Sequence, residues 1–186
     1  LLAKSVFTHH LNFEELRYLG VMQRLAIGYG VTSLVAITVK HKYFPAIILV
    51  TFAVYFLLLA MGDGFNLSAT NIVARFDVWA LGTSHMYHDG GMAFDPEGLL
   101  STLPAVCHVM VGFYCGKLLF SAKDNDEKIQ RLFLVGTILT FAGFLLSYGC
   151  PINKKVWSHT FVITPCGLAS SFLSLLIWII YIRVYP

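Results

Sequence analysis

Five long apolar segments constrain this chain more than any other feature. They cover about residues 21–39, 43–61, 99–120, 132–148 and 161–181. A helix of about 20 apolar residues is long enough to cross the hydrocarbon layer of a bilayer. Backbone polar groups must be hydrogen-bonded within the segment there, which favours α-helices. The sequence therefore predicts an all-α polytopic membrane protein with about five transmembrane helices.

The composition agrees with this prediction. Of the 186 residues, 57% are hydrophobic and 12% are charged, whereas an ordinary globular domain is about 45–50% apolar and about 25% charged. The net charge of +3 is small and its charges are scattered, so we expect the lipid bilayer as a partner and no nucleic acid. The cysteines form no C-x-x-C pair and no cluster has metal-ligand spacing, so we expect buried thiols and no metal site.

No repeat or low-complexity tract divides the chain, and residues 1–186 are expected to form a single membrane domain. The first residues, LLAKSVFTHH, begin without Met and resemble the middle of a sequence, which indicates a fragment of a longer polytopic protein. Residues 11–19 predict a short amphipathic helix along the membrane interface, because Asn12 and Glu15 resemble a capping box. A homodimer is left open.

A long polar interval, residues 62–102, separates the second apolar segment from the third. Within it, residues 71–82 (NIVARFDVWALG) have the periodicity of a helix, and we expect a re-entrant or surface helix there. Gly90 and Gly91 indicate a turn in the loop that follows.

The end of this interval has the residue types of a helix start. Asp95 is an N-cap type, Pro96 suits the first helical position, and Glu97 adds negative charge to the first turn. We therefore expect the third membrane helix to begin here, with two carboxylates and Ser101 at one membrane surface. His108, further along, is expected to be a packing residue.

The distribution of basic residues predicts the orientation. Of the 13 Lys and Arg residues, two lie in the loop 40–42 and four lie at and after the end of the third segment, namely Lys117, Lys123, Lys128 and Arg131. Because cytoplasmic loops carry an excess of Lys and Arg, these regions are expected in the cytoplasm. The intervals 62–102 and 150–160 then lie on the non-cytoplasmic side.

Three further cations each have two interpretations, and two of them, Lys154 and Lys155, weakly oppose the predicted orientation. Arg24 lies early in the first membrane segment, where it either snorkels outward or faces a polar cavity. Lys154 and Lys155 lie on the outer side beside Trp157, where they either snorkel or bind an anionic group.

Three stretches resemble one known family. Residues 71–106, which include LGTSHMYHDGGMAFDPEGLLSTLPAV, resemble the corresponding region of heparan-α-glucosaminide N-acetyltransferase and its bacterial relatives. Residues 151–164 (PINKKVWSHTFVIT) are similar to the family's Pro-Ile/Val-Asn-Lys-x-x-Trp-Ser stretch, and residues 16–30 (LRYLGVMQRLAIGYG) to its Leu-Arg-x-x-Gly-Val-Leu-Gln-Arg segment. The stretches occur in family order and span most of residues 16–164.

The resemblance implies a transmembrane acetyltransferase that takes acetyl from acetyl-CoA and delivers it to the amino group of a glucosamine-type sugar. It also implies an integral membrane location, with the bacterial inner membrane expected from the bacterial relatives. The family's proposed acetyl-relay histidine lies in a region with no counterpart in this chain. The family also continues into further crossings beyond the last residue given.

Acyl transfer to an amine needs a base, stabilisation of an oxyanion and a grip on a large anionic cofactor. The expected catalytic residues are Asp95, Glu97 and His85, of which His85 matches the family's His-Leu/Met-Tyr position. The residues expected to bind the sugar are Asn153, Trp157 and Ser101, and the cations expected to hold CoA phosphates are Arg24, Lys154 and Lys155.

Two other functions fit parts of the pattern. A transporter for an amino sugar or N-acetylglucosamine would also use discontinuous helices and polar groups inside the membrane, and some bacterial members of the family carry such a label. A non-catalytic scaffold is less well matched, since a scaffold does not need paired carboxylates, Arg and Lys near the membrane.

Overall fold

The structure is a computed structural model, and it describes residues 16–68 and 70–184, with side chains described as far as Tyr181. Nearly all of the regular structure is helical. The elements, in chain order, are α2 (Val21–Thr38), η2 (His41–Tyr43), α3 (Phe44–Met61), α4 (Ile72–Leu81), η3 (Thr83–His85), β1 (His88–Asp89), β2 (Met92–Ala93), α5 (Thr102–Ser121), α6 (Asn125–Leu146), α7 (His159–Trp178) and the π-helical η4 (Ile179–Val184).

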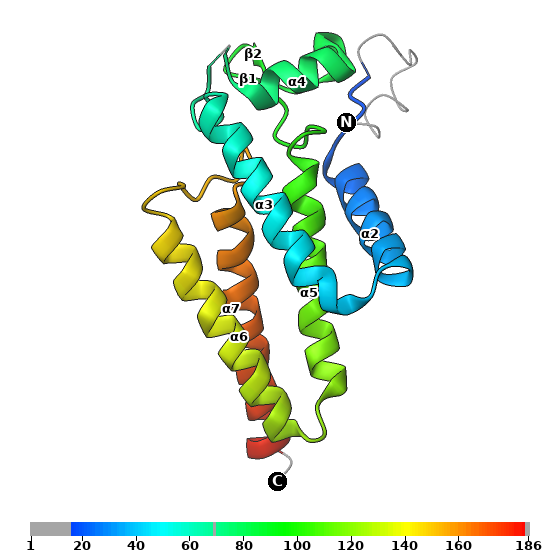
Figure 1. The fold of residues 1–186 in the computed structure, drawn as a ribbon, viewed down its shortest axis with the longest axis vertical. Coiled ribbons are helices and arrows are strands. Elements are labelled where there is room, and N and C mark those ends of the chain that lie inside the picture. The colour runs from blue at the N-terminus through cyan, green and yellow to red at the C-terminus, as the bar shows by residue number, and fades with distance from the viewer. Residues whose placement is uncertain (1–15, 69, 185–186) are drawn as a thin grey trace.

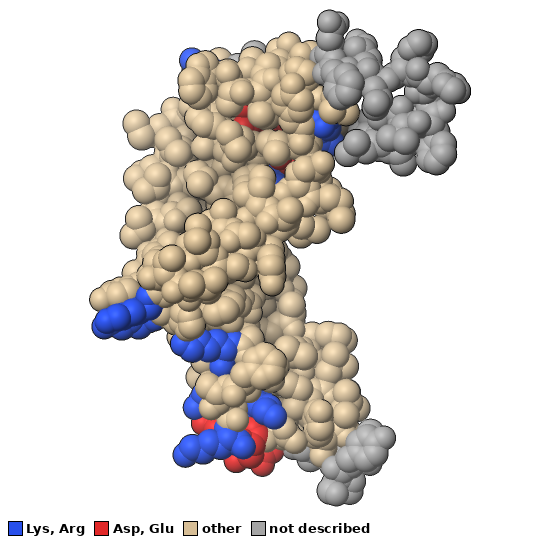
Figure 2. All heavy atoms as spheres, turned by 90° about the vertical axis from the view of Figure 1, so that its right-hand side faces the viewer, with Lys and Arg blue, Asp and Glu red and all other residues tan. Residues whose placement is uncertain are grey.

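Five helices in the described part of the chain are long and apolar enough to cross a membrane, and each overlaps one of the five predicted segments. The prediction of an all-α polytopic membrane protein is thus confirmed. Figure 1 shows α2, α3 and α5 on one side and the antiparallel pair α6 and α7 on the other, while α4 and the β1–β2 hairpin cover one end. Figure 2 shows Lys, Arg, Asp and Glu near the upper end and over the lower half of the face in view, with an uncharged belt between the two groups.

The closest helix packing joins α6 to α7, and it depends on small residues. A Cβ on Gly167 would lie 2.5 Å from the backbone nitrogen of Thr140. Ser170 and Ser174 of α7 donate hydrogen bonds to carbonyl oxygens of α6, at 2.9 Å and 3.0 Å. Small and hydroxyl-bearing residues allow close backbone contact between membrane helices, so this pair forms a tight unit.

The capped end of the bundle has its own core. Tyr55 of α3 is fully buried and donates a hydrogen bond from its hydroxyl to the carbonyl of Val156 at 2.5 Å. Val73 of α4 and Phe94, just after β2, pack in the same cluster. This core holds the loop after α6 against α4 and the hairpin, so the polar residues of both regions lie near each other.

Two local predictions within the long interval agree with the structure. Helix α4 occupies most of residues 71–82, and the side chain of Asn71 caps it by accepting from the backbone nitrogen of Val73 at 2.8 Å. Gly90 and Gly91, with φ of 58° and 85°, form the turn between β1 and β2. Positive φ at both turn positions favours glycine, which explains the pair.

The predicted helix start at Asp95 is wrong. Helix α5 begins at Thr102, and residues 95–101 form turns instead. Asp95 accepts from the backbone nitrogen of Glu97 at 3.0 Å, as a cap would, but it also bonds groups remote in sequence. These tertiary contacts keep residues 95–101 in a non-helical conformation. Helix α5 therefore begins at Thr102 and not at Pro96, the first helical position that the local residue types favoured.

Two further boundaries differ from the predictions. Helix α6 begins at Asn125 rather than near Leu132, because Asp124 caps it and Glu127 pairs with Arg131 one turn later at 2.5 Å. The predicted amphipathic helix at 11–19 lies largely outside the described residues. Its described part, residues 16–19, is irregular rather than helical.

Candidate functional site

The acidic segment before α5 is neutralised by an arginine from the start of the described chain. Arg17 Nη2 forms ion pairs with Asp95 Oδ1 and with Glu97 Oε2, the latter at 2.6 Å, and Arg17 Nε donates to Asp95 Oδ2 at 2.9 Å. The hydrogen bond to Asp95 is the main reason that the pKa of Arg17 is raised. The guanidinium therefore occupies the position from which a cation pairs with both carboxylates.

Asp95 itself is almost completely enclosed, with 1% of its surface exposed. Besides Arg17, it accepts from the backbone nitrogens of Tyr87 and Glu97, at 3.1 Å and 3.0 Å. Glu97 is more open, with 17% of its side chain exposed. Of the two predicted catalytic carboxylates, Glu97 is thus the one that a substrate can reach, and Asp95 holds the turn around it.

Arg24 faces the protein interior and does not snorkel outward. It is 5% exposed, and its Nη2 donates to the carbonyls of Pro96 at 2.7 Å and Gly98 at 3.2 Å, and to Ser101 Oγ. Ser101 is fully buried and also bonds these two carbonyls. Arg24 and Ser101 therefore fix the shape of the turn, and the hydroxyl of Ser101 is enclosed.

Sequence reasoning missed Asp77 of α4. Its carboxylate is fully buried, and Oδ1 accepts from the backbone nitrogens of Leu99 and Leu100, at 2.9 Å and 3.1 Å. Burial raises the pKa of Asp77 to about 6. The sequence pattern that could have identified Asp77 is its spacing in α4, because it lies one helical turn from Val73 and Ala74, which are also buried.

The loop between α6 and α7 lies near the turn before α5, because its Trp157 contacts Arg24, which bonds that turn. Asn153 Oδ1 accepts from the backbone nitrogen of Lys155 at 2.9 Å, and Lys155 Nζ forms an ion pair with Asp89 of the hairpin. Lys154 is exposed. Trp157 has a φ of 52°, and its ring lies against the Arg24 guanidinium, whose central carbon is 4.7 Å from the ring centroid. Trp157 thus links this loop to the turn before α5.

His85 lies beside the N-terminal segment. Its ring stacks on Tyr18 with centroids 4.0 Å apart, Nε2 is 3.2 Å from the Tyr18 hydroxyl, and Nδ1 is 2.9 Å from the carbonyl of Leu16. Both ring nitrogens therefore contact residues that flank Arg17. A catalytic role for His85 stays a prediction.

One pocket brings part of the predicted site together. It has a volume of about 200 Å³ and combines Arg24, Glu97 and Trp157 with His108 and four aliphatic side chains, those of Val21, Leu25, Ala105 and Val109. We call it the Arg24–Trp157 pocket. Asp95 and Ser101 lie behind it in the same turn, whereas His85, Asn153, Lys154 and Lys155 are not part of its lining.

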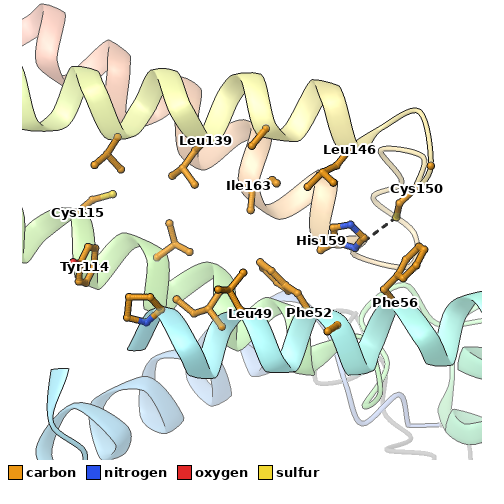
Figure 3. Close-up of a pocket in the computed structure, with 17 residues that line it drawn as sticks. Leu49, Phe52, Phe56, Tyr114, Cys115, Leu139, Leu146, Cys150, His159 and Ile163 are labelled. Atoms are coloured by element: carbon orange, nitrogen blue, oxygen red, sulfur yellow. Dashed lines mark hydrogen bonds between the residues drawn. The ribbon is translucent and has the colours of Figure 1, made fainter. Parts of the chain in front are cut away.

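A larger cavity of about 640 Å³ lies elsewhere, between α3 and α5 on one side and α6 and α7 on the other. Figure 3 shows Leu49, Phe52, Leu139 and Ile163 facing it, with Cys150 and His159 at one end, where Cys150 Sγ is 3.6 Å from His159 Nδ1. Burial raises the pKa of the Cys150 thiol. The surface of this cavity is almost entirely apolar, and its described lining includes no Arg, Lys, Asp or Glu, whereas Arg24 and Glu97 line the Arg24–Trp157 pocket.

Comparison with known proteins gives matches over part of the chain. It is 31% identical over 104 residues to heparan-alpha-glucosaminide N-acetyltransferase of Mus musculus, covering 45% of this chain and 15% of that protein. It is 28% identical over 109 residues to the enzyme of the same name from Homo sapiens, covering 48% of this chain and 16% of that protein. No family model matches the chain.

The predicted resemblance is therefore confirmed as a partial similarity. The chain spans about 15% of the length of these curated relatives. Together with the five apolar helices, the similarity supports an integral membrane protein related to this acetyltransferase over a limited region.

Proposed function

We propose that this chain is part of a membrane acetyltransferase that transfers acetyl from acetyl-CoA to the amino group of a glucosamine-type sugar. The observation that carries the proposal is the similarity to two proteins named heparan-alpha-glucosaminide N-acetyltransferase. The transporter alternative gains no support from these names. The large cavity also offers almost no polar groups to an amino sugar.

The polar end of the bundle supplies groups that suit this reaction. Glu97 lines the Arg24–Trp157 pocket and is partly exposed, so in this proposal it removes the proton from the attacking amine. The amine nitrogen bonds to the thioester carbonyl carbon, the carbon–sulfur bond breaks, and CoA leaves as its thiol with the proton that Glu97 took from the amine. Asp95 positions Glu97, because it accepts from the Glu97 backbone nitrogen and shares Arg17 with it.

The two loop regions belong to one surface in this proposal. Lys155 of the α6–α7 loop pairs with Asp89 of the hairpin, so intervals 62–102 and 150–160 meet at the same end of the bundle. We assign this end to the non-cytoplasmic side of a bacterial inner membrane, as the positive-inside rule favours. Exposed Lys154 and Lys155 then remain candidates for an anionic part of the donor or acceptor.

The test measures acetyl transfer from acetyl-CoA to glucosamine by the purified protein in nanodiscs. Glu97→Gln should lower kcat by about 10²–10⁴-fold, the range expected when a general base is lost. Asp95→Asn should lower it less, because Asp95 acts through Glu97. Glu127→Gln, in α6 at the opposite end, is the matched control and should retain full activity. Normal activity of Glu97→Gln would show that the assignment of the base is wrong.

The same assay separates the enzyme from the transporter. Strict dependence on acetyl-CoA, with N-acetylglucosamine as product, is expected for the enzyme. Uptake of labelled glucosamine into proteoliposomes without acetyl-CoA would contradict the proposal. Cross-linking in nanodiscs would test whether the protein forms the homodimer that the sequence analysis left open.

A further inference from the structure

Three buried nitrogen donors belong to two residues that line the Arg24–Trp157 pocket, and they lack an acceptor among the described residues. Arg24 Nε, Arg24 Nη1 and Trp157 Nε1 have no hydrogen-bond partner among the described residues. Nearly all buried donors in proteins are hydrogen-bonded, and leaving one unpaired destabilises the protein, more so when the donor is charged. The guanidinium carbon of Arg24 lies 4.7 Å from the centroid of the Trp157 ring, so the two side chains are neighbours. A ligand with an oxygen acceptor would remove this cost.

The pocket restricts the size and character of such a ligand. Its volume of about 200 Å³ is below the roughly 300–1,000 Å³ typical of sites for whole drug-sized molecules. Four of its lining residues are aliphatic, namely Val21, Leu25, Ala105 and Val109. The pocket therefore suits a small group that has an apolar part next to an oxygen, and it is too small for a nucleotide.

We propose that the Arg24–Trp157 pocket is a subsite for the acetyl group. The acetyl oxygen accepts hydrogen bonds from Arg24 and Trp157, and the methyl contacts the aliphatic side chains. This inference rests on the proposed function and names the part of the substrate that the pocket takes. In this proposal Arg24 binds the acetyl oxygen and not the CoA phosphates that the sequence suggested.

The charges favour an acyl oxygen over a sugar ammonium at this point. Arg24 would repel a cation, and Arg17 already neutralises the nearby carboxylates. In acyl transfer, negative charge develops on the carbonyl oxygen, and fixed donors in a water-poor site stabilise that charge. The acetyl group of the donor thioester and the N-acetyl group of the product sugar share this chemistry.

The experiment measures equilibrium binding to the purified protein in nanodiscs with two pairs of probes, acetyl-CoA against CoA and N-acetylglucosamine against glucosamine. The wild type should bind the acetylated member of at least one pair more tightly, and the responding pair identifies the source of the acetyl group. Trp157→Phe removes the indole N–H but retains a ring against Arg24. It should reduce this preference about three- to tenfold, as expected for one hydrogen bond.

A second variant tests the contact with the methyl. Leu25 lines the pocket but is 56% exposed, so truncation should disturb the fold little. Leu25→Ala should enlarge the pocket and improve binding of the propionyl analogue of the responding probe relative to the acetyl form. Leu34→Ala is the matched control, since Leu34 lies on the same helix, is 62% exposed and is outside the pocket lining.

These outcomes separate the subsite from the overall function. No preference for acetylated probes in the wild type, or an undiminished preference in Trp157→Phe, would overturn the subsite even if acetyl transfer is normal. A preference for the acetylated sugar that Trp157→Phe reduces would support the subsite even in a protein that transfers no acetyl. In that case only the proposed reaction would fail.

Discussion

The buried carboxyl group of Asp77 should make the protein less stable as pH rises from acid to neutral. Its oxygen Oδ1 accepts from the backbone nitrogens of Leu99 and Leu100, while Oδ2 is buried without a partner among the described residues. Burial raises the pKa of this group from 3.8 to about 6. As pH rises, Asp77 therefore loses its proton at a lower pH in the unfolded chain than in the folded state. Above that pH the folded state is destabilised, because its buried carboxyl is costly to ionise.

The size of the effect follows from the pKa difference. Each pKa unit corresponds to about 1.4 kcal/mol, and pH 4 is already slightly above the unfolded pKa, so the folded state should lose about 2 kcal/mol of stability between pH 4 and pH 7. Asp77→Asn keeps an oxygen for both backbone N–H groups and cannot ionise. It should match the wild type below pH 4 and exceed its free energy of unfolding by up to about 3 kcal/mol above pH 6.

Chemical denaturation in detergent micelles at pH 4.0 and pH 7.5 checks this prediction. Asp63→Asn is the control with the opposite sign, because hydrogen bonds from Ser68, Asn66 and Thr70 lower the pKa of Asp63. That lowered pKa contributes stability above the unfolded pKa, and the contribution is lost as pH falls, so Asp63→Asn should destabilise more at pH 7.5. An Asp77→Asn variant whose advantage is equal at both pH values, or larger at pH 4.0, would refute the reasoning.

Two further substitutions test the packing around the turn before α5. A Cβ at position 98 would clash with Asp77 Oδ2, so Gly98→Ala should lower the thermal unfolding midpoint. Gly30→Ala is the control and should leave the midpoint unchanged, because a Cβ at position 30 would have no atom within 4 Å. Equal midpoints for the two variants would contradict the geometry. Arg17→Ala should lower the free energy of unfolding by a few kcal/mol, because it leaves the buried Asp95 carboxylate without its cation. Arg17→Lys should recover part of that loss in the same denaturation assay. An Arg17→Ala variant as stable as the wild type would show that the ion pair does not hold the turn.

Local pattern was sufficient for the membrane helices. The apolar segments at 43–61 and 161–181 predicted α3 and α7, because crossing a bilayer depends on a continuous stretch of side chains and not on remote contacts. Gly90 and Gly91 likewise predicted their turn. The start of α6 was missed since its charged first turns resemble a loop until the cap at Asp124 is recognised.

The candidate site was only partly visible in the sequence. Residue types and the family resemblance pointed to Asp95, Glu97, Arg24 and Trp157, and three of these line one pocket. The enclosed state of Asp95 could not be read from its neighbours, because its cation lies 78 residues earlier. The importance of Asp77 was hidden for the same reason, since its partners lie 22 and 23 residues later.

The sequence by itself determined that this chain forms apolar helices with one long polar interval, because hydropathy and turn chemistry act over a few neighbouring residues. Only the tertiary structure decided where α5 begins, which way Arg24 points and which carboxylate a ligand can reach. Those features depend on hydrogen bonds and ion pairs between groups that folding brings together from distant parts of the chain.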